Sequence, residues 1–227
     1  MVIDGLQYQF LNDFWAVTKN ISNNNREIRI EKEIEGHPVV AIGDKVFTDN
    51  EDLEYIHIPE SICSIGEYAF AGCTNLRRVK TIPFPSGYPS TVLCVSTRAF
   101  QDCRSLVVVD TLKKLSLSGG QNFQRCHKLE TVSMHNELYG DIPQQAFQAC
   151  TSLDFLVLNN DEQIFIRNNA FNWCSSLKSL YFKSERVICE DEDTWISLTG
   201  KKIYCRANCN LMDLGYDGTE VIVWEKP

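Results

Sequence analysis

AFQACTSLDFLVL (146–158) and AFNWCSSLKSLYF (170–182) are two segments of this 227-residue chain that share one spacing of residues. In each segment a Phe is followed by Cys, Leu and Leu at steps of three residues. Self-similarity at a fixed period decides the architecture of a repeat protein, so further copies of this spacing would determine the fold of the chain.

The same spacing occurs six times, with only small changes of period. The Phe positions step by 23, 30, 23, 24 and 24 residues, and they are Phe47, Phe70, Phe100, Phe123, Phe147 and Phe171. Three residues after each Phe stands a Cys, except in the first copy, where Asn50 takes its place. A period of about 20–29 residues with L-x-x-L-x-L spacing is typical of leucine-rich repeats.

This pattern predicts a repeat solenoid. The apolar residues that alternate at the end of each L-x-x-L-x-L run predict a short strand, and strands of successive coils would pair in parallel. The Phe-x-x-Cys segments are too short for a full helix, so we expect one helical or 3-10 turn at each. The predicted fold is therefore a right-handed leucine-rich-repeat coil, mainly of short parallel strands, capped at both ends.

The connectors between copies point to one family. HPVVAIGDKVF (37–47) and SICSIGEYAF (61–70) share an Ile-Gly pair shortly before the Phe. The run IHIPESICSIGEYAFAGCTNL (56–76) resembles the repeat of the BspA-like leucine-rich repeat family, which occurs in bacterial surface and secreted proteins. The resemblance covers about residues 28–182, and it departs at Asn50 and at an insertion between Phe70 and Phe100.

The chain is interpreted as one solenoid with two ends. Residues 1–27 predict a small β-hairpin cap, because Leu6, Tyr8 and Phe10 alternate before Asn12. Residues 28–182 form the solenoid, and residues 183–227 form a degenerate last repeat with a C-terminal cap. In that last part, 202–204 and 221–223 are expected strands, 211–214 a short helical turn, and Trp195 stands where the next Phe would fall.

The ten cysteines fall into three groups, of which one, Cys63, Cys94 and Cys189, lies in the connectors and is expected to be buried in strands. Five occupy the equivalent position of successive copies and should stack as a ladder of free, buried thiols: Cys73, Cys103, Cys126, Cys150 and Cys174. Their side chains would lie parallel, whereas a disulfide needs a dihedral angle near 90°. For Cys205 and Cys209, free thiols are favoured over a disulfide, and a zinc site lacks further ligands.

Composition and motifs exclude several functions. The net charge of −8 argues against nucleic acid as a main partner. No apolar run is long enough to span a membrane, and no signal peptide is recognised at the N-terminus, although the family resemblance implies export. No nucleophile elbow, phosphate-binding loop or dinucleotide motif is present, so we expect no catalytic residue, no metal and no cofactor.

The candidate binding residues lie between the core positions of each strand, where they must point away from the core. They form the open face of the predicted sheet. The candidate residues are Tyr55, His57, Arg78, Lys80, Val108, Asp110, Phe155, Val157 and Tyr181. Contiguous exposed apolar area often marks an interaction site, although a flanking segment could instead cover these residues. The Pro-rich insert 81–91, with Phe84 and Tyr88, is more simply a loop packed on the coil than a second binding site.

The favoured hypothesis is a non-enzymatic module that binds a protein or peptide through this face. The family resemblance implies adhesion or host interaction at a cell surface, with an extracellular-matrix or host surface protein as partner. Arg78 and Lys80 would suit an acidic segment of that partner. The alternative is an intracellular structural or scaffolding repeat protein.

Overall fold

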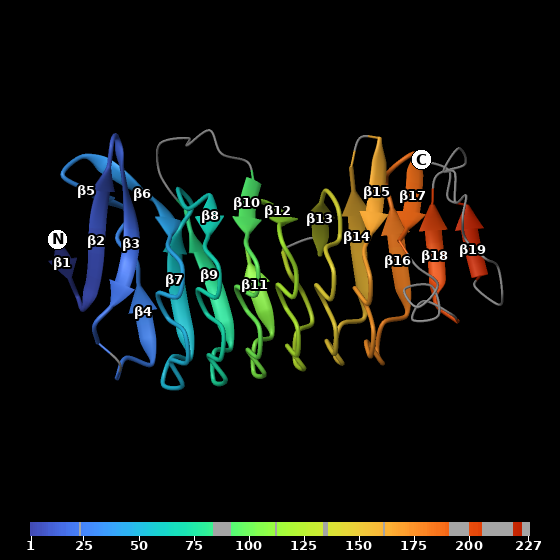
Figure 1. Cartoon of the computed structure of the whole chain (residues 1–227), viewed down its shortest axis with the longest axis horizontal. Coiled ribbons are helices and arrows are strands. Elements are labelled where there is room, and N and C mark those ends of the chain that lie inside the picture. Colours follow the sequence, from blue (N-terminus) through green and yellow to red (C-terminus); the bar gives the residue numbers. More distant parts are fainter. Residues whose placement is uncertain are drawn as a thin grey trace.

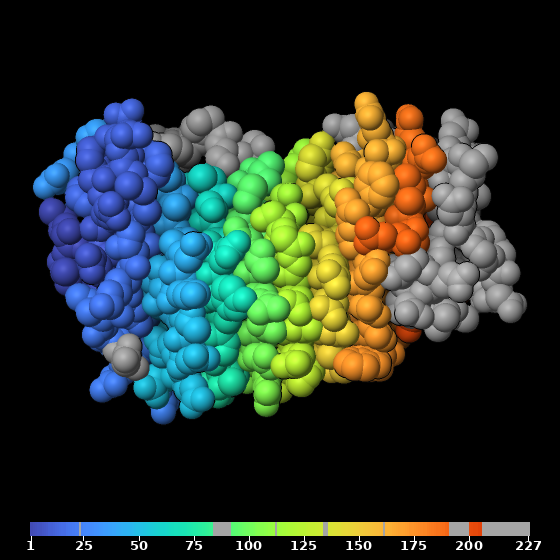
Figure 2. Space-filling view, viewed as in Figure 1, coloured from blue at the N-terminus to red at the C-terminus, as the bar shows by residue number. Residues whose placement is uncertain are grey.

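The computed structural model is a solenoid whose coils follow one another along its long axis (Figure 1). It describes residues 1–22, 24–83, 92–111, 113–133, 136–160, 162–190 and 200–205, and the backbone of 220–223. In the space-filling view the described coils form consecutive bands from the N-terminal end onward (Figure 2). Sequence order is therefore also spatial order, as expected when each repeat contacts its neighbours.

One row of strands comes from the L-x-x-L-x-L segments, and we call it the front row. Its members are β4 (Glu27–Arg29), β7 (Tyr55–Pro59), β9 (Arg78–Ile82), β11 (Val108–Asp110), β14 (Phe155–Asn159), β16 (Ser179–Phe182), β18 (Lys202–Cys205) and β19 (Glu220–Val223). Equivalent positions of neighbouring strands are in register, for example Ile56 with Val79 and Leu156 with Leu180. The predicted parallel strands are confirmed, including the two expected near the C-terminus.

A second row comes from the connectors, and we call it the back row. It contains β6 (His37–Ile42), β8 (Ser64–Ile65), β10 (Val92–Val95), β12 (Lys114–Leu117), β15 (Gln163–Ile166) and β17 (Arg186–Cys189). Inward-pointing Leu, Ile and Val from both rows form one continuous core along the axis. Each coil alone would leave this apolar side exposed, so the stack supplies the burial.

The two rows are joined in the middle of the molecule by β13 (Glu137–Tyr139). This strand pairs with β12 of the back row on one side and with β14 of the front row on the other. The front row is consequently split: β4, β7, β9 and β11 form a sheet of four strands, whereas β14, β16, β18 and β19 belong to the long sheet.

Polar side chains bind backbone groups at this point, where the long sheet passes from the back row to the front row. Asn136 is buried, and its side-chain oxygen accepts a hydrogen bond from the Val132 N–H at 3.0 Å. Its side-chain NH₂ donates to the Phe155 carbonyl. The Ser133 hydroxyl accepts from the Glu137 N–H at 2.9 Å. These side chains provide partners for backbone groups that an uninterrupted ladder would otherwise pair, as buried polar groups require.

The turns around each Phe are not helical, which corrects the expectation of helical or 3-10 turns. Two positions of every turn, two residues before and two residues after the Phe, have left-handed backbone conformation. In one coil these are Gln145 (φ 55°) and Ala149 (φ 61°). A left-handed residue on each side interrupts the right-handed run that a helix needs. The described residues contain no helix.

The turns instead form a ladder of their own. In each of the five steps from one Phe turn to the next, three backbone N–H groups donate to carbonyls of the following coil, at 2.8–3.0 Å. Phe147, for example, donates to Ala170 at 2.9 Å. The six Phe rings stack behind these turns, with centroids 5.0–5.7 Å apart and planes within 10° of parallel.

The predicted cysteine ladder is confirmed. Each ladder thiol is buried and donates a hydrogen bond to the carbonyl of the Phe in the preceding coil, at 3.0–3.1 Å. The Cys150 Sγ, for instance, lies 3.1 Å from the Phe123 carbonyl oxygen. A thiol fits this position because it fills a small apolar site and still supplies a weak donor.

An antiparallel hairpin stands at the N-terminal end of the solenoid. β2 (Leu6–Leu11) and β3 (Phe14–Asn20) pair with each other, and β3 also pairs in parallel with β6. The short strands β1 (Val2–Ile3) and β5 (Glu33–Ile34) pair with β2 and β6. β3 thereby pairs with backbone groups of β6 at the N-terminal side of the long sheet.

Candidate functional site

The nine candidate residues all lie on the front row, but the split of that row divides them into two groups. Six are on the sheet of four strands, and three are on β14 and β16 of the long sheet. We call the outward side of the front row the open face. Alternation along each strand explains the placement, since the residues between two core positions point to the other side of the sheet.

The group on the four-stranded sheet is mainly polar, and its members are partly or fully exposed. Tyr55, Arg78 and Val108 lie in register on adjacent strands, as do His57, Lys80 and Asp110. Tyr55 keeps 39% of its surface exposed, and Arg78 and Lys80 are also exposed. The His57 Nε2 lies 2.8 Å from the Glu27 carboxylate on β4. Among the described residues, Arg78 and Lys80 have no carboxylate within ion-pair distance, so both positive charges are available to a partner.

The group on the long sheet is aromatic and apolar. Phe155 is 37% exposed, and its ring meets the Tyr181 ring edge to face at a centroid distance of 6.1 Å. The Tyr181 ring stacks on Tyr204 of β18 at 4.4 Å, with 7° between the planes. Val157 and Tyr181 are in register, so Val157 adjoins this row. We call Phe155, Tyr181 and Tyr204 the aromatic row.

Tyr204 is a member of this site that the sequence prediction missed. The sequence did contain a signal for it. Ile203 follows the core residue Leu180 by one repeat length of 23 residues, so Tyr204 is the equivalent of Tyr181. The register pairs Tyr181 with Tyr204 directly, which places both side chains on the open face. The strand at 202–204 was expected, but the Phe and Cys of the repeat are missing before it. Its outward residue, Tyr204, was therefore not predicted to belong to the open face.

A charged group borders the aromatic row on β13. The Glu137 carboxylate accepts a hydrogen bond from the Asn159 side chain at 2.7 Å and pairs with the Lys183 Nζ at 3.1 Å. Glu137 is in register with Val157 and lies next to it on the open face. The aromatic row is therefore apolar in its middle and polar at its edge, as is common in protein interfaces.

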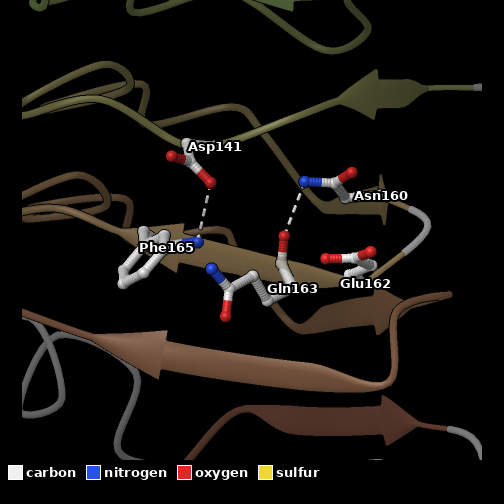
Figure 3. A pocket seen from close by; sticks show the side chains of 5 residues that line it. All are labelled: Asp141, Asn160, Glu162, Gln163 and Phe165. Carbon is white, nitrogen blue, oxygen red and sulfur yellow. Dashed lines mark hydrogen bonds between the residues drawn. The ribbon is translucent and has the colours of Figure 1, made fainter.

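A polar pocket of about 400 Å³ lies apart from these rows, near the turn between β14 and β15 (Figure 3). Its lining residues are Asp141, Asn160, Glu162, Gln163 and Phe165. The Asp141 carboxylate accepts from the Phe165 N–H at 2.9 Å, and the Asn160 side chain donates to the Gln163 carbonyl at 2.6 Å. These groups hold the local backbone, so the pocket has a structural explanation.

Several other sequence predictions concern residues outside the described part of the chain. They are Phe84 and Tyr88 of the insert, Trp195, Cys209, and the expected helical turn at 211–214. Within the described ranges, no group of three or more His, Cys, Asp or Glu side chains could hold a metal ion. No described helix has the length and hydrophobicity that crossing a bilayer requires.

A family model described as the BspA type leucine-rich repeat region matches residues 40–178 of this chain in six copies. No curated protein matches the chain.

Solved structures of leucine-rich repeat proteins are similar to this chain. A leucine-rich repeat protein of T. pallidum superposes with a TM-score of 0.67 at 21% identity, covering 96% of this chain and 97% of that chain. A leucine-rich cell surface protein of Faecalibacterium prausnitzii has a TM-score of 0.44 at 20% identity, with 83% and 72% of the two chains covered. A leucine-rich repeat protein of Bacteroides ovatus has a TM-score of 0.43 at 16% identity, with 92% and 86% covered.

Proposed function

Because this chain belongs to the BspA-type leucine-rich repeat family, we propose that it binds a protein at a cell surface, in adhesion or host interaction. Membership of a leucine-rich repeat family supports a role as a protein-interaction module. The family and its solenoid fold are typically non-enzymatic. The surface role follows from the occurrence of the family in bacterial surface and secreted proteins. The partner would be an extracellular-matrix or host surface protein.

The observation that carries the proposal is the aromatic row on the open face. Interfaces are enriched in aromatic residues, which bury a large area and lose little conformational entropy. Phe155 remains 37% exposed although it already contacts Tyr181. Tyr181 and Tyr204 stack on each other and both stay partly exposed, so part of each side chain is accessible to a partner.

The two groups of the open face suit different parts of one partner. Arg78 and Lys80 offer positive charge on β9, while the aromatic row offers apolar area on β14, β16 and β18. Strands are spaced by about 4.8 Å, so β9 and β14, three coils apart, are separated by roughly 14 Å. A partner segment with an acidic end and an apolar end would contact both groups across the split.

The first test is a binding screen of the purified protein against extracellular-matrix and host-cell surface proteins. The double variant Phe155→Glu/Tyr181→Glu should raise the Kd for the partner by at least about tenfold, because buried aromatic anchors dominate such interfaces. The matched control is Trp173→Glu, which changes an aromatic residue that is 69% exposed in a turn outside the open face. Equal binding by the double variant and the control, with both proteins folded, would reject the aromatic row as the site.

A further inference from the structure

A second pocket lies at the opposite end of the molecule from the aromatic row. It is about 400 Å³ in volume, and it is lined by Lys19 and Asn20 of β3 and by residues 45–52 of the first Phe turn. β3 of the hairpin pairs with β6 at this end, but the hairpin contributes only two residues beside this turn. In the later coils a complete preceding turn occupies the corresponding place.

Asn50 is the unusual residue of this pocket. It occupies the first ladder position, where five later copies have a Cys whose thiol donates to the Phe carbonyl of the preceding coil. Before the first copy there is no such Phe carbonyl. Asn50 is only 8% exposed, and neither its side-chain nitrogen nor its oxygen has a hydrogen-bond partner among the described residues. Leaving such an amide unpaired is costly, so it favours a ligand that supplies both an acceptor and a donor.

The backbone of the same turn offers further acceptors. In the second coil, the Ala69 and Ala71 carbonyls accept from the N–H groups of Phe47 and Asp49, both at 2.8 Å. The equivalent carbonyls of the first turn belong to Val46 and Thr48, and no described residue donates to either of them. By the geometry of the repeat, these carbonyls point toward the N-terminal end. The wall of the pocket thus presents backbone carbonyls that lack, among the described residues, the N–H donors found between the later coils.

The charges of the pocket favour a cationic ligand. Three carboxylates line it, on Asp49, Glu51 and Asp52, against the two ammonium groups of Lys19 and Lys45. Within the described part of the chain, none of the three carboxylates lies in an ion pair. The whole chain has a net charge of −8, which attracts a basic ligand and opposes the approach of a second copy.

We propose that this pocket binds a basic peptide segment of another protein, whose main chain continues the turn ladder by one rung. The peptide N–H groups would donate to the Val46 and Thr48 carbonyls. A peptide carbonyl and N–H would pair with the two ends of the Asn50 amide, which a lone cation cannot do. Adding a backbone to an open ladder is a general mode of peptide recognition, in which the main chain gives affinity and side chains give specificity.

The test uses the 227-residue protein labelled with ¹⁵N and the capped peptide acetyl-Gly-Arg-Gly-amide as the probe. We expect the side-chain NH₂ signals of Asn50 to shift and saturate on titration. The peptide acetyl-Gly-Glu-Gly-amide should bind at least about threefold more weakly, because its charge is repelled. Methylguanidinium carries the cation without a main chain and should leave the Asn50 signals unchanged.

Two variants and a control locate the site. Asn50→Cys restores the ladder residue and should weaken binding of the arginine peptide by at least about tenfold, as observed from backbone amide shifts, because a hydrogen-bonded amide is lost. Asp52→Asn changes an exposed rim residue that can hardly affect folding, and it should weaken binding about threefold. Glu130→Gln removes a comparably exposed carboxylate from a central coil and should leave binding unchanged.

Three results would overturn the proposal. The first is the absence of a saturable shift with the arginine peptide in the folded wild-type protein. The second is an equal response to methylguanidinium, which would reduce the pocket to a cation site. The third is concentration-dependent association in sedimentation that Asn50→Cys abolishes, which would assign the pocket to a second copy of this chain. If Asn50→Cys fails to fold, the Asp52→Asn and Glu130→Gln pair decides the location.

Discussion

At the scale of single residues, the cysteine ladder couples the fold to the protonation of its thiols. Burial raises the pKa of the Cys174 thiol to about 12. Burial also raises the pKa of Cys73, Cys126 and Cys150 well above the usual value. The protonated thiol is the form that donates to the Phe carbonyl, so the folded protein holds these protons more tightly than the unfolded chain.

The free energy of unfolding should therefore fall as the pH rises above the usual thiol pKa. Unfolded thiols begin to lose protons near about pH 8.5, whereas the thiols of Cys73, Cys126, Cys150 and Cys174 stay protonated in the folded state. The unfolded state then binds fewer protons, and each such thiol reduces stability by up to about 1.4 kcal/mol per pH unit. Below that pH the contribution is fully present. Urea unfolding between pH 7 and 10.5 measures the slope.

Cys150→Ala supplies the control for this pH dependence. The variant should be less stable at pH 7, by about 1–3 kcal/mol, because it loses a buried thiol and its hydrogen bond. Its stability should also fall less steeply with pH, since one titrating group is gone. A slope identical to that of the wild type would show that Cys150 does not contribute to the alkaline loss.

At the scale of the element, each coil depends on how closely it approaches the preceding one. A Cβ atom added at Gly66 would lie 2.6 Å from the Gly43 carbonyl carbon and 2.7 Å from the Asp44 nitrogen. These are backbone atoms, which cannot rotate away as a side chain could. The Ile-Gly pairs of the first two connectors thus allow the first coils to pack closely.

Gly66→Ala should destabilise the protein by about 1–3 kcal/mol, because the extra methyl group forces two coils apart. Ser96→Ala is the matched control, since Ser96 follows the core residue Val95 as Gly66 follows Ile65. It should change stability by less than about 0.5 kcal/mol. Denaturant midpoints of the two variants and the wild type give the comparison, and equal stability of all three would contradict the close-approach explanation.

At the scale of the whole molecule, the crossing strand β13 makes the solenoid two linked units. The four-stranded sheet ends at β11, with one isolated bridge from Val108 to Thr131 beyond it. The long sheet passes from the back row to the front row through Glu137–Tyr139. Asn136 sits at this junction and connects Val132 with Phe155 by hydrogen bonds.

Asn136→Ala should weaken this junction selectively. We expect a loss of about 2–3 kcal/mol, because one buried and one partly buried backbone group lose their partners. In a repeat protein such damage stays close to its site. Hydrogen exchange should therefore accelerate in β13 and β14 while β7 and β9 keep their protection. Asn75→Ala, which removes one exposed hydrogen bond to the Glu51 carbonyl, is the control, and uniform acceleration across all strands would contradict a local junction.

The sequence predicted the features that repeat, and the structure differs where the repeat carries no information. Phe147, Cys150 and Leu153 were placed correctly because six copies share their spacing. The turn conformation was not predicted, since Gln145 and Ala149 are residue types that do not signal a left-handed backbone. The crossing strand was missed because Leu138 has no counterpart at its position in the other copies. For the open face, alternation gave the outward residues, but it could not show that β13 divides them into two groups.

The turn ladder also gives the molecule an electrical direction. Hydrogen bonds between parallel strands alternate in direction, so the dipoles of a sheet nearly cancel. In the turns, by contrast, all fifteen bonds between coils run from an N–H of one coil to a carbonyl of the next. Their dipoles add along the axis, as those of a helix do, with the negative pole at the N-terminal end. The pole lies on the unpaired carbonyls of the first turn, so each coil added to such a solenoid would move the opposite pole further away and leave the partial charge at the first turn unchanged.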